Sequence, residues 1–143
     1  MTRKAFAIMA VSILMAAAAA PMAAQITTLT ANIPFEFVVA GKTMPAGAYE
    51  VWKSPTSEMV MLRGINQRTS ALSLVSHGDV ESRNPAADTR LVFNRYGDRY
   101  FLHEIVNGYG SLALTLPESR AEREMAKVAT LQPTEVLAVL ARR

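Results

Sequence analysis

The chain holds few residues able to carry out chemistry: it has two histidines and no cysteine. His103 precedes Glu104 in a run of alternating residues, and neighbouring side chains of a strand point to opposite faces. We therefore expect no acid–base pair between these two, and we expect His103 to share a face with Phe101 and Ile105. A lone histidine needs an orienting partner for base catalysis, so a partly buried histidine is the simpler interpretation.

A second group of candidate ligands lies further upstream, where His77, Asp79 and Glu81 alternate along the chain. One histidine and two carboxylates can hold a metal ion loosely, but His-Gly-Asp is also ordinary turn sequence. The chain has no Gly-x-Ser-x-Gly nucleophile motif and no glycine-rich phosphate loop. The sequence therefore predicts no catalytic residue, no metal site and no cofactor, and it favours a non-catalytic protein over an enzyme.

Arginine and tyrosine interleave around a predicted hairpin tip at residues 95–100. Both types are enriched at interfaces because they combine a large contact area with a polar end. The alternative is that the tyrosines pack at the edge of the sheet and the arginines cover them with their aliphatic stems. The candidate binding residues are Arg95, Tyr96, Arg99, Tyr100 and His103.

The elements that position these residues follow from periodicity and turn signals. Residues 90–96 and 99–106 flank Gly97-Asp98, which is a strong hairpin signal. Period-two alternation predicts further strands at 31–39, 48–53, 59–63, 70–76 and 112–116. Pro34 predicts that the first of these strands lies at a sheet edge or has this position facing outward, and Pro45 and Gly47 predict a turn before the second.

The period changes near the C-terminus. Ser119 and Glu122 match a capping box, which predicts a helix that begins there and ends before Pro133. Residues 134–143 are expected to form another helical turn or two, or a frayed tail. The fold class is therefore all-β, an antiparallel sandwich or small barrel of six to seven strands, with a C-terminal α-helix.

The first two dozen residues have the pattern of a secretory signal peptide. Arg3 and Lys4 are followed by an uncharged, mostly apolar run that Pro21 closes too early for a membrane-spanning helix. We expect cleavage after Ala24, with residues 18–20 as a second candidate site and an uncleaved anchor as the alternative. The mature protein is then periplasmic or secreted, and it meets the membrane only transiently during export.

The domain plan and the charge follow from this cleavage. Residues 1–24 are the signal peptide, 25–117 form a β-rich domain, and 118–143 form a C-terminal helix and tail of the same domain. Without Arg3 and Lys4 the chain has 13 basic and 12 acidic residues, so its net charge is about +1. Charge and compartment together argue against nucleic acid as a partner.

Three segments together carry a family resemblance: 33–49 (Ile-Pro-Phe-Glu-Phe to Pro-Ala-Gly-Ala-Tyr), 90–102 (Arg-Leu-Val-Phe-Asn-Arg-Tyr-Gly-Asp-Arg-Tyr-Phe-Leu) and 116–124 (Leu-Pro-Glu-Ser-Arg-Ala-Glu-Arg-Glu). They resemble a family of short, signal-bearing bacterial proteins to which no function is assigned. The resemblance spans most of the mature chain and implies export and a single β-domain. It carries no catalytic residues to transfer.

These observations favour an exported, non-catalytic binding module that binds an envelope protein or polymer through the hairpin tip. One alternative is a small hydrolase that acts on an envelope polymer through His103 and a nearby carboxylate. The other is a barrel that carries a small apolar ligand, in a cavity lined by Phe35, Phe37, Phe93 and Phe101.

Overall fold

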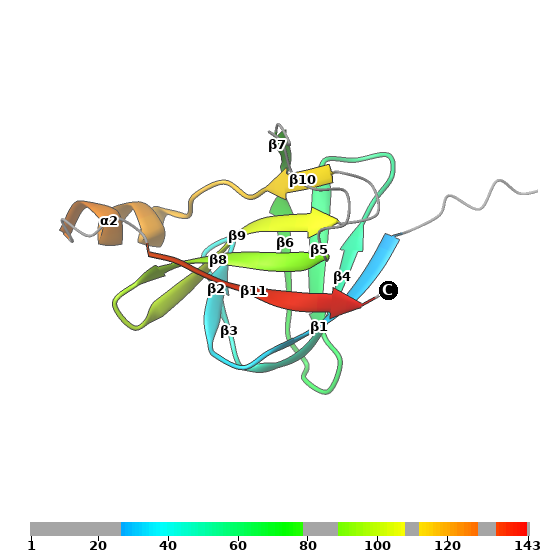
Figure 1. Cartoon of the computed structure of the whole chain (residues 1–143), viewed down its shortest axis with the longest axis horizontal. Helices are drawn as coiled ribbons and strands as arrows, with labels where there is room; N and C mark the ends of the chain where they lie inside the picture. The colour runs from blue at the N-terminus through cyan, green and yellow to red at the C-terminus, as the bar shows by residue number, and fades with distance from the viewer. Residues whose placement is uncertain (1–26, 79–88, 108–111, 129–133, 143) are drawn as a thin grey trace, which may run out of the picture.

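The computed structural model describes residues 27–78, 89–107, 112–128 and 134–142 (Figure 1). The signal peptide predicted at 1–24 and most of the loop predicted at 77–88 lie outside the described residues. Within the described ranges, no helix is long and apolar enough to cross a membrane. The predicted fold class is confirmed: the described residues are mostly β-strand, with one helix among them near the C-terminus.

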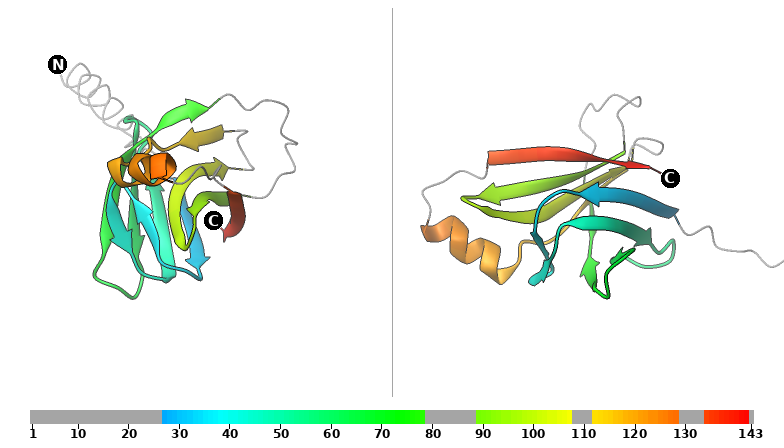
Figure 2. Two further views of the ribbon diagram at one scale, coloured as in Figure 1. Left: turned by 90° about the vertical axis from the view of Figure 1, so that its left-hand side faces the viewer. Right: turned by 90° about the horizontal axis from the view of Figure 1, so that it is seen from below.

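Two sheets face each other and enclose the core (Figure 2). The first, sheet A, contains β1 (Thr27–Ile33), β4 (Gly47–Lys53), β5 (Met59–Gly64) and β6 (Ser70–Leu74). The second, sheet B, contains β2 (Phe37–Val39), β3 (Lys42–Met44), β7 (Ser76–Gly78), β8 (Arg90–Tyr96), β9 (Arg99–Asn107), β10 (Leu112–Thr115) and β11 (Thr134–Arg142). The helix is α2 (Arg120–Val128).

The C-terminal segment corrects the sequence prediction. Residues 134–143 were expected to form a helical turn or a frayed tail, but Thr134–Arg142 is strand β11. Thr134 to Leu140 pair with β8, and Ala141 and Arg142 pair with β1 at the edge of sheet A. β11 therefore joins the two sheets. The segment is extended because β8 and β1 each have main-chain N–H and C=O groups that would be unpaired without a strand beside them.

The strand predicted at 31–39 is divided in two. β1 ends at Ile33 and β2 begins at Phe37, with Pro34 exposed at the break because proline cannot donate to a ladder. The break takes the chain from sheet A to sheet B, where β2 pairs with β9 in parallel. This ladder departs from the antiparallel pairing that the sequence pattern suggested.

The described residues form eleven strands in place of the predicted six or seven, because two predicted strands are divided and β3 and β11 are added. The predicted strand at 70–76 bends at Val75, so β6 stays in sheet A while β7 pairs with β10 in sheet B. With β11 on one side and this bend on the other, the two sheets are joined along both sides.

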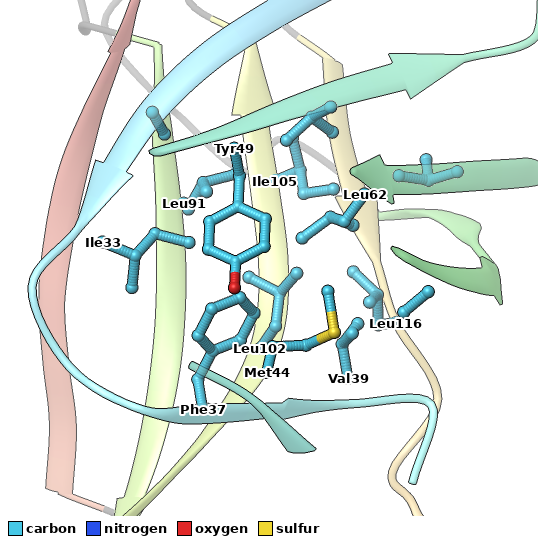
Figure 3. Packing of buried hydrophobic residues seen from close by; sticks show 14 of the residues in the cluster. Ile33, Phe37, Val39, Met44, Tyr49, Leu62, Leu91, Leu102, Ile105 and Leu116 are labelled. Atoms are coloured by element: carbon cyan, nitrogen blue, oxygen red, sulfur yellow. The ribbon is translucent and has the colours of Figure 1, made fainter. Parts of the chain in front are cut away.

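The core between the sheets is formed by inward residues of β1 to β6, β8, β9 and β10 (Figure 3). Tyr49 and Phe37 lie at its centre with ring centroids 5.2 Å apart, edge to face. The Tyr49 hydroxyl donates to the Pro45 carbonyl at 2.5 Å, so the buried phenol is satisfied by the predicted turn. Gly47 completes that turn with φ of 154°, and the Gln67 side chain fills the space that a Cβ would need.

Helix α2 covers a smaller apolar cluster on the outer face of sheet B. Val38, Tyr96 and Phe101 form this cluster, and Ala121 and Met125 of α2 pack against it. The predicted capping box is present, because the Glu122 N–H donates to Ser119 Oγ at 3.1 Å. The helix is thus fixed at its first turn and by one apolar side.

Deletion of residues 134–143 tests the bridging role of β11. The truncated protein should not fold cooperatively. The free energy lost with a strand that pairs on both sides should exceed ~5 kcal/mol, which is the lower end of the free energies of unfolding of small domains. The measurement is urea unfolding followed by circular dichroism, with deletion of Arg143 alone as the control. An unchanged unfolding midpoint would contradict the bridging role and favour the frayed-tail prediction.

Candidate functional site

The predicted hairpin-tip residues are divided between the two faces of the β8–β9 hairpin. Arg95 and Tyr100 oppose each other and lie on the inner side, where Tyr100 stacks on Phe35 at 4.0 Å between ring centroids. The Arg95 guanidinium lies 5.6 Å from the centroid of the Tyr100 ring, and its Nε donates to the Gly97 carbonyl at 2.6 Å. Both side chains are therefore engaged within the hairpin.

The remaining tip residues lie on the outer face, against α2. Tyr96 is only 2% exposed and packs edge to face on Phe101, with ring centroids 5.7 Å apart. Arg99 lies over the same Phe101 ring at 5.6 Å from its centroid. The arrangement matches the alternative raised from the sequence, in which aromatic rings pack and arginines cover them.

His103 lies at a β-bulge, which corrects the predicted faces of β9. Val92 opposes Glu104 but Phe93 opposes Leu102, so His103 is the extra residue of the longer strand. As a result, Ile105 belongs to the main core while Phe101 belongs to the outer cluster, and His103 cannot share a face with both. Simple alternation fails at this point.

A buried polar cluster beside the bulge fixes α2 to sheet B. Glu122 is 3% exposed, and Asn94 Nδ2 donates to its Oε1 at 3.0 Å. The Ser119 main chain also hydrogen-bonds this carboxylate, which completes the capping box. Burial raises the pKa of Glu122 and the Glu118 charge adds to this, while the bonds from Asn94 and Ser119 and the charge of His103 oppose it.

This cluster has the composition of an acid–base site, but its carboxylate is too enclosed for a substrate to reach. Its carboxylate is the nearest candidate for the partner of His103 in the hydrolase hypothesis, yet it is enclosed and committed to Asn94 and Ser119. A group that activates water or substrate must lie within hydrogen-bond reach of it. We therefore assign Glu122 the role of a helix anchor.

The second predicted group of ligands is only partly described. His77 Nδ1 lies 3.2 Å from Glu58 Oε2, and both side chains are more than half exposed. Asp79 and Glu81 lie outside the described residues. Among the residues that the structure does describe, no three histidines or carboxylates gather in a geometry that could hold a metal ion.

A groove lies elsewhere, on the outer face of sheet A. An open groove of about 290 Å³ runs across β4, β5 and β6. It is lined almost wholly by apolar side chains, with two hydroxyls from the β4–β5 loop. The groove residues are Trp52, Ser54, Pro55, Ser57, Met59, Met61 and Leu72.

Strand register explains why these side chains gather. Trp52 pairs with Met61, and Met61 pairs with Leu72, so the three form a row across three adjacent strands. Met59 and Leu74 pair in the next row on the same face. Leu72 is 53% exposed and Leu74 is 62% exposed, values that are high for leucines on a sheet.

A polar row borders the groove on one side. Arg63 Nη2 donates to Glu50 Oε2 at 2.8 Å, and Trp52 Nε1 donates to the same oxygen at 3.3 Å. These two hydrogen bonds lower the pKa of Glu50. The Arg63 guanidinium also lies 5.5 Å from the centroid of the Trp52 ring, so the indole is held in place.

The sequence contained a signal for this surface that periodicity analysis missed. In three successive strands, apolar residues occupy both the inward and the outward positions. The inward residues are Tyr49 and Val51 in β4, Val60 and Leu62 in β5, and Ala71 in β6. The outward residues are Trp52 in β4, Met59 and Met61 in β5, and Leu72 and Leu74 in β6. An antiparallel sheet with one solvated face needs only one apolar phase. Excess apolar residues in the second phase of three neighbouring strands therefore indicate a binding or covered face.

The phenylalanines proposed to line a ligand cavity do not do so together. Phe35 and Phe37 pack edge to face on Phe93, at 5.1 and 5.5 Å between ring centroids, while Phe101 belongs to the outer cluster under α2. A small internal cavity of about 50 Å³ lies instead between the sheets, next to Leu29, Ile105 and Leu114. It has room for about one water molecule.

Comparison of the chain with protein-family models, with curated proteins and with solved structures gives no match. The assignment of a function therefore depends on the geometry of these surfaces.

The Glu122→Gln variant tests the buried anchor. Because the folded-state pKa of Glu122 is raised, its contribution to stability is present below the ordinary value of 4.5 and is lost as pH rises through the folded-state pKa. Glutamine stays neutral and still suits the capping box. The variant should have a higher urea midpoint than the parent at about pH 8, and the two should converge at about pH 3.5.

The matched control is Glu124→Gln on the exposed side of the same helix, which should leave the pH profile unchanged. A Glu122→Gln protein that is less stable than the parent at alkaline pH would show that the ionised carboxylate is required.

Proposed function

We propose that the chain is an exported, non-catalytic binding module of the bacterial cell envelope, and that it binds an apolar segment of a protein partner. The observation that carries the proposal is the open groove on sheet A, with Trp52, Met61 and Leu72 in one row. The signal peptide expected at 1–24 supports the envelope as the compartment. The binding site moves from the predicted hairpin tip to this groove.

The chemistry of the lining favours a protein segment over a sugar polymer. Methionine side chains adapt to partners of different shape, and tryptophan and methionine are enriched at the centres of protein interfaces. A sugar hydroxyl could accept a hydrogen bond from the Trp52 indole N–H, but this N–H already donates to Glu50. The polar groups of the lining are the hydroxyls of Ser54 and Ser57, at the loop that borders the groove.

The surroundings of the groove also suit reversible binding. Arg63 and Glu50 form a polar border beside the apolar row, as at interfaces with an apolar centre and a polar rim. The rim also holds the Trp52 ring before a partner arrives, which limits the entropy lost on binding. A non-catalytic role is consistent with the enclosed position of the Glu122 carboxylate.

A photo-reactive amino acid in the groove tests this function. Placed at Met61 in the protein made by its own host, it should crosslink to a distinct envelope protein upon irradiation. The same residue at Asp98, on the exposed hairpin tip, is the control and should give little product. Mass spectrometry of the product identifies the partner and separates it from a second copy of the chain.

A competing substitution sharpens the result. Trp52→Ala should reduce the yield from the Met61 position at least tenfold, because truncation of a central tryptophan typically costs a binding interface more than ~1.4 kcal/mol. Trp52 is only half-buried, so the variant should keep the circular dichroism spectrum of the parent. Equal yields from Met61 and Asp98, or products from Asp98 alone, would return the binding site to the hairpin tip.

A further inference from the structure

Strand β6 is the end of a hydrogen-bonded ladder. Among the described strands its only ladder partner is β5, and the strand order of sheet A stops there. The ladder is framed by two bonds of 2.9 Å, from the Gly64 N–H to the Thr69 carbonyl and from the Val75 N–H to the Glu58 carbonyl. Because bonded and non-bonded pairs alternate, the main-chain groups of Ser70, Leu72 and Leu74 point away from β5.

Side chains, not another strand, contact these outward groups. The Ser70 carbonyl accepts a hydrogen bond from Lys42 Nζ at 2.7 Å, and the Leu74 carbonyl accepts one from Ser73 Oγ at 3.0 Å. Each carbonyl has a second lone pair and can accept a further bond. No side chain of the described residues bonds the main-chain groups of the central residue Leu72.

The sequence of β6 lacks the features that keep edge strands from pairing. Its five residues are Ser-Ala-Leu-Ser-Leu, with no charged residue and no proline. Natural edge strands usually carry lysine, proline or an inward charge to prevent association. Here the outward-facing leucines, Leu72 and Leu74, are each more than half exposed.

The edge is complementary to itself. Leu72 is the middle residue of β6, so antiparallel pairing about a twofold axis through Leu72 places Ser70 of each copy opposite Leu74 of the other. The row of Trp52, Met61 and Leu72 then continues into the same row of the second copy.

Charge follows the same symmetry. Lys42 and Arg68 lie at the Ser70 end of β6, and neither forms an ion pair among the described residues. Glu58 lies at the opposite end, where its carbonyl bonds the Val75 N–H and its carboxylate contacts His77. Antiparallel pairing brings the basic end of each copy next to the acidic end of the other.

We propose that two copies of the chain associate through antiparallel pairing of β6 with β6, centred on Leu72, so that their A sheets join into one sheet. The two grooves then meet at the seam and form one apolar floor across both copies. This inference goes beyond the proposed function, because it requires only the edge of β6 and not a partner in the groove.

Sedimentation velocity of the protein as purified from its host tests the association. The mass should approach that of a dimer as concentration rises, and Leu72→Arg should shift it to that of a monomer by placing two cations opposite each other. Val128→Arg, at an even more exposed apolar position on α2, is the control and should leave the dimer intact.

A charge-reversal cycle tests the orientation of the two copies. Arg68→Glu and Glu58→Arg should each weaken the dimer on the order of threefold to tenfold, because each change affects two symmetric pairs at the surface. The double variant should regain much of the lost affinity, since its opposite charges again meet across the seam. If the losses of dimer affinity in the two single variants simply add in the double variant, this pairing is excluded.

Other outcomes overturn the inference directly. A monomer at every concentration, or a dimer that Leu72→Arg leaves intact, excludes pairing through β6. A monomer in which the β6 amides become protected from hydrogen exchange only on addition of another envelope protein would show that β6 pairs with a foreign strand. Photo-crosslinking from Met61 reports on the groove separately, so failure of one proposal is distinguishable from failure of the other.

Discussion

The main-chain hydrogen bonding of β11 is the constraint on which the remaining structure depends. β8 and β1 belong to different sheets, and each would expose a row of unpaired N–H and C=O groups without a strand between them. β11 satisfies both rows, so the sandwich closes only when residues 134–142 are in place. The hairpin of β8 and β9, its bulge and the helix that covers it are all positioned from this junction.

Much of the fold could be predicted because local signals agreed with the final structure. The Gly97-Asp98 hairpin, the turn at Pro45 and Gly47 and the capping box at Ser119 are all present. β11 could not be predicted, since its Ala, Leu and Glu residues favour helix and its apolar positions have no clean period. Its strand conformation comes from two distant edges, and intrinsic propensity yields to such tertiary context.

The candidate site was harder to predict than the fold because alternation assigns faces but not their surroundings. Arg95 and Tyr96 were placed together by sequence, but adjacent strand residues face opposite sides, and Tyr96 is covered by a helix that lies more than 20 residues downstream. The bulge at His103 reverses the predicted phase beyond it. Conversely, the row of Trp52, Met61 and Leu72 depends on the register of three strands, which no single strand reveals.

The two outer faces of the sandwich provide the physical reason for placing the proposed binding surface on sheet A. Each sheet carries apolar side chains on both of its faces, which exceeds what a two-layer core can bury. On sheet B the excess is Val38, Tyr96 and Phe101, and α2 covers it, with Glu122 buried at some electrostatic cost to hold the helix there. On sheet A no element of the described chain covers the corresponding row, and Leu72 stays more than half exposed. Monomeric proteins rarely keep contiguous exposed apolar surface beyond a limited size unless another molecule covers it, so the uncovered face is where a partner of this protein is expected to bind.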